Sequence, residues 1–183
     1  MKLSGKKVVV LVEDFYQDLE VWYPILRLRE EGVNVTVIGP QKRSYKGKYG
    51  YSIEADADES QAKAANFDAV VIPGGWAPDR LRLSKKLVDF VRQMDRAGKV
   101  IASICHGGWM LASAGIVKGR TVTSYIAIKD DLINAGARFV DKEVVRDENL
   151  ITSRKPDDLP AFVREIIQIL KEQGSRVQGS QKT

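Results

Sequence analysis

The chain has 183 residues, of which 44% are apolar and 29% charged, as in a globular protein with enough chain for one domain and a sizeable core. The formal net charge is +5, but basic residues alternate with acidic ones, as in "RLREEG" and "VRDENL". Residues 41–51 mix basic and aromatic side chains, which suits RNA, yet a solvated hairpin is the simpler interpretation. We therefore expect no nucleic-acid partner.

The cellular compartment is constrained by three features of the sequence. The single cysteine cannot form an internal disulfide, so the chain needs no oxidising compartment. The first apolar run is short and soon becomes acidic, unlike a signal peptide. No apolar run reaches the roughly 18 residues of a membrane span. We expect a cytoplasmic protein without membrane contacts.

The first half of the chain alternates strand-like and helix-like segments. Residues 6–12 are an unbroken, mostly β-branched run, typical of a strand covered on both faces. Residues 18–31 have helical spacing, with Asp18 as the predicted N-cap and Gly32 as the stop. The predicted apolar face of this helix is Leu19, Trp22 and Leu26, flanked by Val21, Ile25 and Leu28. The sequence then predicts a strand at 34–39, a hairpin at 45–56, a strand at 67–75 and a helix at 84–98.

The second half continues the alternation. We expect a strand at 99–105, a short helix at 106–115, a strand-like segment at 120–125, a helix at 128–136 and a strand pair at 143–153 folded about Glu148 and Asn149. The last helix has Pro160 near its start. Its apolar face is formed by Leu159, Phe162, Val163, Ile166, Ile167 and Leu170. Residues 1–173 are thus predicted to form a single domain, and residues 174–183 a disordered tail.

The alternation predicts an α/β fold, with a mainly parallel central sheet and helices on both faces. Such sheets bind ligands at the carboxyl ends of their strands, where the strand order reverses. Three strand ends carry unusual residues, in "VEDFYQDLE", "PGGWAPD" and "CHGG". We therefore expect these three distant segments to meet at one rim of the sheet and form the functional site.

Cys105 and His106 are the only cysteine and the only histidine of the chain, and they are adjacent. At a sharp strand-to-helix turn the first residue is strained and its side chain is presented at the top of the sheet, as in a nucleophile elbow. The helix N-terminus is expected to lower the thiol pKa, and His106 can act as general acid or base. The alternative is an inert buried cysteine beside a surface histidine.

Two further groups are candidates at the same rim. The backbone amides of Gly75, in the pair Gly74–Gly75, and of His106 are the predicted oxyanion hole. Glu20 can be held protonated by burial and hydrogen-bond to the sulfur, or it can be an ordinary first-turn glutamate. One cysteine and one histidine fall short of a zinc site, and no phosphate-binding or dinucleotide motif is present. We expect no metal and no cofactor.

The sequence resembles the ThiJ/PfpI superfamily, and within it the PfpI-like branch of intracellular peptidases and deglycases. The resemblance covers roughly residues 6–171 and rests on motifs such as "DAVVIPGGWAPDRLR", "ASICHGGWMLASAG" and "GRTVTSYIAIKDDLINAGA". It implies a flavodoxin-like three-layer sandwich similar to class I glutamine amidotransferases. It also implies Cys105 as nucleophile, Glu20 as its carboxylic-acid partner, and the amides of Gly75 and His106 as the oxyanion hole.

The resemblance further implies a homo-oligomer, either a dimer or a hexamer. In peptidase-like members an acidic residue from a neighbouring subunit completes a Cys–His–acid triad, and the matching position here is Asp79. Relatives commonly have Glu at that position, Arg where Trp76 stands, Pro at Gly108 and His at Lys155. These differences affect the third triad member and the substrate preference more than the nucleophile.

Three functions remain open. The first is cofactor-free chemistry on a small aldehyde or a glycated protein, as a deglycase or glyoxalase, because a thiolate, a proton shuttle and a small pocket suffice for it. The second is an intracellular cysteine peptidase acting on peptides, which also needs an extended groove and an acid for the leaving amine. The third is a non-enzymatic oxidative-stress sensor or chaperone, in which Cys105 oxidises to a sulfinic acid that Glu20 stabilises.

Overall fold

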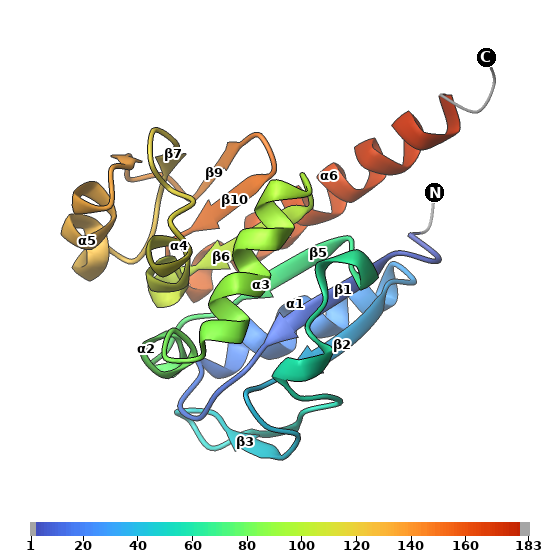
Figure 1. Ribbon diagram of the computed structural model, residues 1–183, viewed down its shortest axis with the longest axis horizontal. Coiled ribbons are helices and arrows are strands. Elements are labelled where there is room, and N and C mark those ends of the chain that lie inside the picture. The colour runs from blue at the N-terminus through green and yellow to red at the C-terminus, as the bar shows by residue number, and fades with distance from the viewer. Residues whose placement is uncertain (1–2, 180–183) are drawn as a thin grey trace.

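The computed structural model describes residues 3–179 and has one central sheet between two layers of helices (Figure 1). The six strands lie in the order β2 (Asn34–Ile38), β1 (Lys7–Leu11), β5 (Ala69–Ile72), β6 (Val100–Ile104), β10 (Leu150–Ser153) and β9 (Val144–Asp147). All neighbouring strands are parallel except β10 and β9. The register places Val9 between Thr36 of β2 and Val70 of β5. The flavodoxin-like sandwich predicted from the sequence is confirmed.

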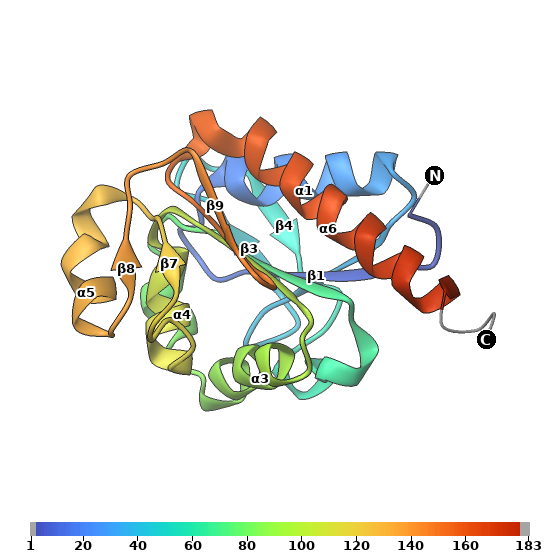
Figure 2. The same cartoon turned by 90° about the horizontal axis from the view of Figure 1, so that it is seen from above.

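The helices cover both faces of the sheet, as its buried strands require. Helices α1 (Asp18–Glu30) and α6 (Leu159–Gly179) lie on one face (Figure 2). Helices α3 (Lys85–Arg96) and α4 (Gly108–Ala114) lie on the other, and the short α2 (Ala77–Leu81) packs against α4. Every residue of β5 and β6 is buried. An uninterrupted apolar run is therefore stable here only as a strand covered on both sides.

The apolar face of α1 differs from the predicted one. Leu19 and Leu26 are 57% and 59% exposed, whereas Val21, Ile25 and Leu28 are fully buried. Both sets have helical spacing, so the periodicity alone does not decide which of them faces the sheet. The packing of α1 against β2 and α6 decides it. The helix is also capped by Gln17 rather than Asp18, because the Gln17 side chain accepts a hydrogen bond from the Leu19 amide at 2.7 Å.

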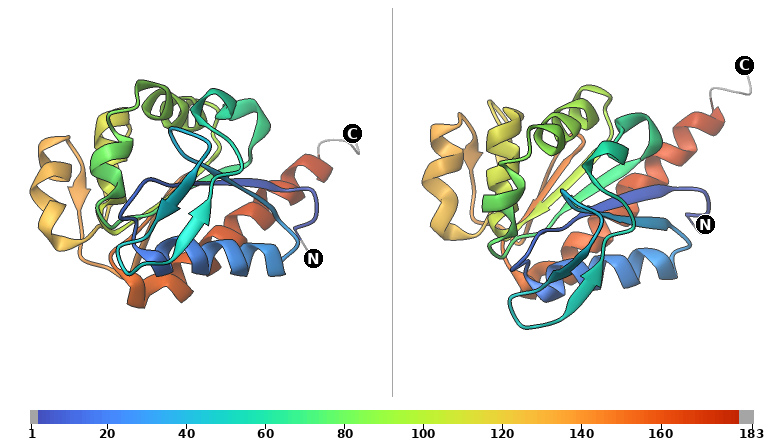
Figure 3. Two further views of the ribbon diagram at one scale, coloured as in Figure 1. Left: turned by 90° about the horizontal axis from the view of Figure 1, so that it is seen from below. Right: turned by 60° about the horizontal axis from the view of Figure 1, so that its bottom comes forward.

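The predicted hairpin is present as β3 (Ser44–Lys46) and β4 (Ser52–Glu54), which are antiparallel. Asp18, which is freed from capping, holds its turn. Its carboxylate accepts hydrogen bonds from the amides of Tyr49 at 2.9 Å and Tyr51 at 3.0 Å. Both views of Figure 3 show the cyan hairpin close to the start of the blue helix α1. The hairpin turn is thereby held next to the loop that follows β1.

The remaining helices and strands lie close to the positions predicted from the sequence, except at the C-terminus. The strand pair β9–β10 turns at Glu148, which has a φ of 55°. The predicted helix near residue 130 is α5 (Lys129–Asn134), between the two-residue strands β7 (Thr121–Val122) and β8 (Arg138–Phe139). Helix α6 continues past Gly174, where a disordered tail was expected, because extending a formed helix costs less than starting one. Residues 180–183 of the expected tail lie outside the described residues.

The strand order fixes where a ligand site belongs. From β1 the chain moves to β2 on one side, and it later returns to β5 on the other side. The order of the sheet therefore reverses at β1 and β5, and the carboxyl ends of these strands leave a crevice between their loops. Strand β6 lies next to β5, so the loop after β6 borders the same crevice. Within residues 3–179, none of the helices combines the length and the apolar character that crossing a bilayer requires.

Candidate active site

Cys105 lies at the sharp turn between β6 and α4. It follows Ile104 directly and begins a short 3₁₀ turn, Cys105–Gly107. Its φ is 60°, a left-handed conformation that is uncommon for residues other than glycine. Such a conformation persists only where the surrounding structure imposes it. Cys105 is thus presented on a strained turn at the strand end, the geometry of a nucleophile elbow.

Two glycines allow the neighbouring loop to approach this turn. A Cβ atom on Gly74 would lie 2.7 Å from both the Cys105 Cβ and the Glu20 Oε2 atoms, and 2.9 Å from the His106 nitrogen. Gly75 has a φ of +72°, and a Cβ atom there would lie 2.4 Å from the Gln17 nitrogen. Neither position accommodates a side chain. The loops after β1, β5 and β6 therefore meet at this glycine pair.

Glu20 points from the first turn of α1 into the interior beneath Cys105. It is fully buried, and its Oε2 atom accepts a hydrogen bond from the Gly74 amide at 2.7 Å. Its Oε1 atom has no hydrogen-bond partner among the described residues. Burial raises the pKa of this carboxyl to about 7, although the Gly74 amide, the neighbouring Cys105 side chain and the Lys48 charge favour the ionised form. The structure thus places Glu20 where a carboxyl is held protonated at mildly acidic pH.

The pKa of the Cys105 thiol shifts in the direction opposite to the prediction. Burial, together with the nearby Glu20 carboxylate, raises the pKa of the Cys105 thiol to about 12. The backbone amides of His106 and Gly75 act the other way, because they stabilise the thiolate. The expected gain from the helix N-terminus is outweighed because Cys105 is only 7% exposed. The raised pKa therefore favours the protonated thiol over the thiolate in this site.

His106 lies directly beside the Cys105 sulfur. Its Nδ1 atom lies 3.3 Å from the Cys105 Sγ atom. Burial and the Lys48 charge lower the pKa of the imidazole, so it is neutral at physiological pH. Tyr125 stacks on the ring at a centroid distance of 5.0 Å, and Trp109 meets it edge-on at 5.2 Å. The two aromatic rings fix the orientation of His106.

A pocket of about 260 Å³ opens above the sulfur, and we call it the Cys105 pocket. It is lined by Gln17, Glu20, Lys48, Tyr49, Gly75, Trp76, Cys105, His106, Tyr125 and Pro156. Four predicted site residues, Cys105, His106, Glu20 and Gly75, thus lie in one cavity. Lys48 and Tyr125 were missed by the sequence analysis. Lys48 belongs to the hairpin turn, and no local pattern indicates that Asp18 holds this turn over the site.

The fifth predicted site residue, Asp79, lies outside that pocket. It lines an adjacent cavity of about 330 Å³ together with Phe15, Trp76, Arg80, His106 and Trp109, which we call the aromatic recess. Among the described residues, the Asp79 side chain has no hydrogen bond to His106. Within this chain it therefore does not complete a Cys–His–acid triad.

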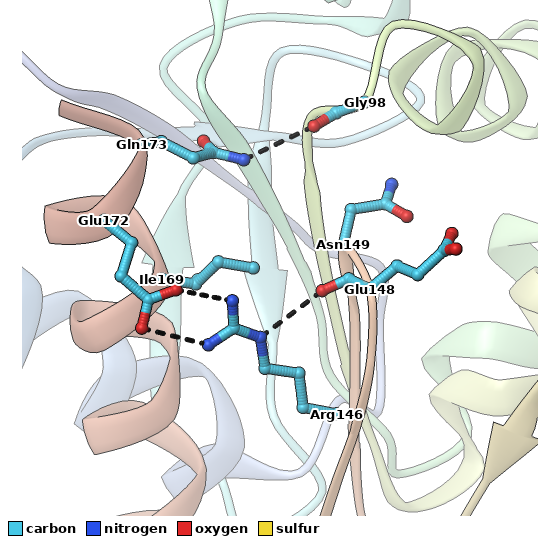
Figure 4. A pocket seen from close by; sticks show the side chains of 7 residues that line it. All are labelled: Gly98, Arg146, Glu148, Asn149, Ile169, Glu172 and Gln173. Atoms are coloured by element: carbon cyan, nitrogen blue, oxygen red, sulfur yellow. Dashed lines mark hydrogen bonds and ion pairs between the residues drawn. The ribbon is translucent and has the colours of Figure 1, made fainter. Parts of the chain in front are cut away.

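A further cavity, of about 320 Å³, lies at the opposite end of the sheet (Figure 4). It is bordered by the residues that precede β6 and β10, Gly98 and Asn149, and by α6. Arg146 crosses it to Glu172, with an Nη2–Oε2 distance of 2.6 Å. The only cysteine and histidine of the chain are far from this end, since they follow β6 rather than precede it. Between residues 3 and 179, no cluster of three or more His, Cys, Asp or Glu side chains is arranged to hold a metal ion.

The chain is an α/β sandwich in which a cysteine on a sharp strand-to-helix turn lies beside a buried glutamate. Comparisons with known proteins identify a family with this fold. The DJ-1/PfpI family model matches residues 6–169. The chain is 46% identical over 165 residues to the deglycase PfpI of Pyrococcus furiosus, covering 90% of this chain and 99% of that protein. It is 42% identical over 169 residues to the protein/nucleic acid deglycase 2 of Escherichia coli, covering 91% and 98%.

A solved structure of the same family has the same fold. The crystal structure of Drosophila melanogaster DJ-1beta matches with a TM-score of 0.84 and 33% identity, covering 90% of each chain. The chain belongs to the DJ-1/PfpI family, as the sequence motifs predicted.

Replacing Glu20 by Gln is expected to change how stability depends on pH. The folded-state pKa of about 7 lies above the ordinary glutamate pKa of 4.5, so the folded protein binds this proton more tightly than the unfolded chain. The resulting stabilisation is complete below pH 4.5 and is lost as the pH rises through 7. We expect the wild-type free energy of unfolding to fall by about 2 to 3 kcal/mol more than that of Glu20→Gln between about pH 5 and pH 8. Urea denaturation at both pH values measures this, and parallel curves for the two proteins would contradict it.

Proposed function

We propose that this protein is a cofactor-independent cysteine enzyme that acts on reactive carbonyls, removing early glycation adducts from proteins and converting free methylglyoxal to lactate. The observation that carries the proposal is the convergence of the Cys105 sulfur, the His106 imidazole 3.3 Å away and the buried Glu20 carboxyl in one pocket. Relatives named as deglycases align over nearly their full length, which supports the same chemistry.

The proposed first step is addition of the sulfur to the aldehyde carbon. As the Sγ–C bond forms, the thiol proton passes to His106 and the carbonyl electron pair moves to oxygen. The backbone amides of Gly75 and His106 stabilise negative charge on the sulfur, and we infer that they also stabilise this oxyanion. The raised pKa of the Cys105 thiol is compatible with this route, because the proton leaves during attack rather than before it.

The hemithioacetal then rearranges without an external oxidant. A base removes the proton from the former aldehyde carbon, and a proton returns to the adjacent carbon, so one carbon is oxidised while its neighbour is reduced. The product is a lactoyl thioester on Cys105. Water hydrolyses this thioester, which releases lactate and regenerates the thiol. The sum is methylglyoxal plus water giving lactic acid, so no cofactor is consumed.

The size of the Cys105 pocket favours small carbonyls over peptides. A volume of about 260 Å³ is at the low end for ligand pockets and suits a three-carbon aldehyde or its adduct. A peptidase would need an extended groove, and the Asp79 side chain has no hydrogen bond to His106 within the described chain. The Escherichia coli relative is named for nucleic acid as well as protein deglycation. Nucleic-acid adducts thus join the substrate classes to be tested, although the sequence analysis expects no nucleic-acid partner.

A redox-sensing role is the second candidate, and one observation favours it. The Glu20 Oε1 atom is buried beneath Cys105 and has no hydrogen-bond partner among the described residues. A protonated carboxyl there can donate to an oxygen of a Cys105 sulfinic acid. Sensing and catalysis predict different results after mild peroxide treatment. Oxidation of Cys105 in a protein without carbonyl turnover indicates sensing, whereas turnover that is lost on oxidation indicates an enzyme.

We also propose that the protein forms a homo-oligomer through α1 and the β3–β4 hairpin. The outward side of α1 carries Leu19 and Leu26, and the adjacent hairpin turn carries Tyr49 and Tyr51, 72% and 69% exposed. Trp22 lies between them and meets the Tyr51 ring edge-on at 6.3 Å. Contiguous exposed apolar side chains of this kind mark protein–protein contacts. Because the same patch occurs on every copy, a two-fold dimer can bury it.

Removal of the sulfur tests the enzymatic proposal. We expect Cys105→Ala to abolish lactate formation from methylglyoxal, and His106→Ala to lower kcat by about 100-fold to 10,000-fold because the general base is lost. Leu83→Ala is the matched control, since Leu83 is 79% exposed and lines neither cavity. Lactate is measured by chromatography with circular dichroism as the folding check. Turnover that survives in Cys105→Ala would exclude the proposed mechanism.

Charges placed on the exposed face of α1 test the oligomer. The double variant Leu19→Asp/Leu26→Asp is expected to sediment as a monomer while the wild type does not, because each added carboxylate must be desolvated at the interface. Leu83→Asp, which introduces the same charge at a distant exposed leucine, should keep the wild-type size. The proposal fails if the double variant and the wild type have the same sedimentation coefficient.

A further inference from the structure

Two polar side chains of the Cys105 pocket have no part in the reaction proposed above. Gln17 and Lys48 both line this cavity, Gln17 from the loop before α1 and Lys48 from the turn of the β3–β4 hairpin. In the proposed reaction the sulfur, the imidazole and two backbone amides act on the carbonyl group itself. Gln17 and Lys48 are therefore available to contact the rest of a substrate.

Gln17 presents free N–H groups although it is almost completely buried. It is 9% exposed, and its Oε1 atom accepts the hydrogen bond from the Leu19 amide that caps α1. This bond fixes the orientation of the side-chain amide. The Nε2 atom has no hydrogen-bond partner among residues 3–179. A nearly buried donor without a partner is costly unless a ligand or water completes its hydrogen bonds, so Gln17 offers two N–H groups to the pocket.

Lys48 is held at the same cavity by its backbone rather than by an ion pair. Its amide donates to the Tyr16 carbonyl at 2.9 Å, and its Nζ atom lies 5.2 Å from the Tyr49 ring centroid. The buried Asp18 carboxylate behind the turn uses both oxygens to accept from the amides of Tyr49 and Tyr51. No carboxylate in the described part of the chain forms an ion pair with Lys48. Its ammonium group thus remains available to a ligand.

The other polar groups of the pocket also favour an anion. Among the described residues that line it, Glu20 has the only carboxyl group, and its Oε2 atom is bonded to the Gly74 amide. Burial raises the pKa of this carboxyl to about 7, so it is mostly uncharged at lower pH. The His106 imidazole is neutral, which leaves Lys48 as the charged group of the lining under these conditions. An ammonium and a primary amide together bind a carboxylate through charge-assisted hydrogen bonds.

We propose that Gln17 and Lys48 form a carboxylate subsite of the Cys105 pocket, so that the preferred substrates are 2-oxoaldehydes that carry a carboxylate rather than methylglyoxal itself. The inference rests on the proposed function and specifies its substrate class. In this arrangement the aldehyde carbon lies at the Cys105 sulfur, and the carboxylate lies between the Gln17 amide and the Lys48 ammonium group. Methylglyoxal has only a methyl group to place there and leaves both donors without a partner.

The reaction on such a substrate balances as it does on methylglyoxal. The probe 4,5-dioxopentanoate is methylglyoxal with a carboxymethyl group on its methyl carbon. Addition forms the Sγ–C bond and passes the thiol proton to His106, and the proton shift then oxidises the aldehyde carbon while it reduces the ketone carbon. Water cleaves the Sγ–C bond of the resulting thioester and regenerates the thiol. The sum is 4,5-dioxopentanoate plus water giving 2-hydroxyglutarate and one proton, and the carboxylate in the subsite is unchanged.

Binding is tested without turnover in the Cys105→Ala protein. The ligands are 4-oxopentanoate, which has the carboxylate and the ketone but no aldehyde, and pentan-2-one, its neutral counterpart. Each is titrated while tryptophan fluorescence is recorded, because Trp76 lines the pocket. We expect a Kd at least fivefold lower for 4-oxopentanoate, and we expect Lys48→Met and Gln17→Glu each to remove the difference. Gln17→Glu keeps an oxygen for the Leu19 amide but replaces the N–H donors by a negative charge.

Equal Kd values for the two ligands in the Cys105→Ala protein would overturn the inference, whatever the protein does with aldehydes. A Kd difference that persists in both Lys48→Met and Gln17→Glu would also overturn it, because the carboxylate would then bind elsewhere. Circular dichroism checks that each variant is folded.

Kinetics with Cys105 present test the preference itself. We expect kcat/KM for 4,5-dioxopentanoate to exceed that for the neutral 2-oxopentanal at least tenfold, and Lys48→Met to lower this ratio at least fivefold. Lys48→Arg should preserve most of the ratio, because the positive charge is retained. Lys46→Met is the matched control, since it removes the same charge from an exposed lysine of the same hairpin that lines neither cavity.

Two kinetic outcomes would overturn the subsite. An equal loss of kcat for both aldehydes in Lys48→Met would assign Lys48 to the chemistry at the carbonyl group. An equal fall of the ratio in Lys46→Met and Lys48→Met would assign the preference to the overall charge of the hairpin. Absence of turnover with both aldehydes would instead reject the proposed function, and the Kd values would then decide the subsite.

Discussion

The structure of this site depends on the close approach of three loops at one residue without a side chain. Gly74 lies between the Cys105 Cβ, the Glu20 carboxylate and the His106 amide, at distances that leave no room for a methyl group. This contact brings the carboxyl ends of β1, β5 and β6 together and supports the left-handed conformation of Cys105. The parallel sheet supplies the three strand ends, and the glycine pair allows them to converge. Without this approach the sulfur, the carboxyl and the amides would lie too far apart to form one site.

The convergence also determines the protonation states. Burial raises the pKa of both Glu20 and Cys105. A negative charge on the Glu20 carboxylate raises the Cys105 pKa further, because it repels a negative charge on the sulfur. The site therefore holds a protonated thiol next to a neutral imidazole. In the proposed reaction such a pair forms the nucleophile only when a carbonyl is present to receive the electrons, which limits side reactions of a free thiolate. Tyr125 and Trp109 contribute by holding the imidazole in place.

His106 lines both the Cys105 pocket and the aromatic recess. On one side its Nδ1 atom lies 3.3 Å from the Cys105 sulfur. On the other side it borders a recess whose exposed rings, Phe15 and Trp76, are unusual for their backbone conformation or their exposure. A proton on this imidazole can therefore serve two cavities.

The sequence by itself determined the alternating fold, the strand ends that meet at the rim, and the residues Cys105, His106, Glu20 and Gly75. Buried strands and helix stripes depend on local periodicity, and a lone Cys–His pair before two glycines is a local pattern. Only the tertiary structure decided which side of α1 is buried, because two apolar stripes fit the same helix. It also decided the direction of the thiol pKa, the presence of Lys48 above the site and the separation of Asp79 from the Cys105 pocket. These properties depend on desolvation and on contacts between distant segments, which a linear pattern does not contain.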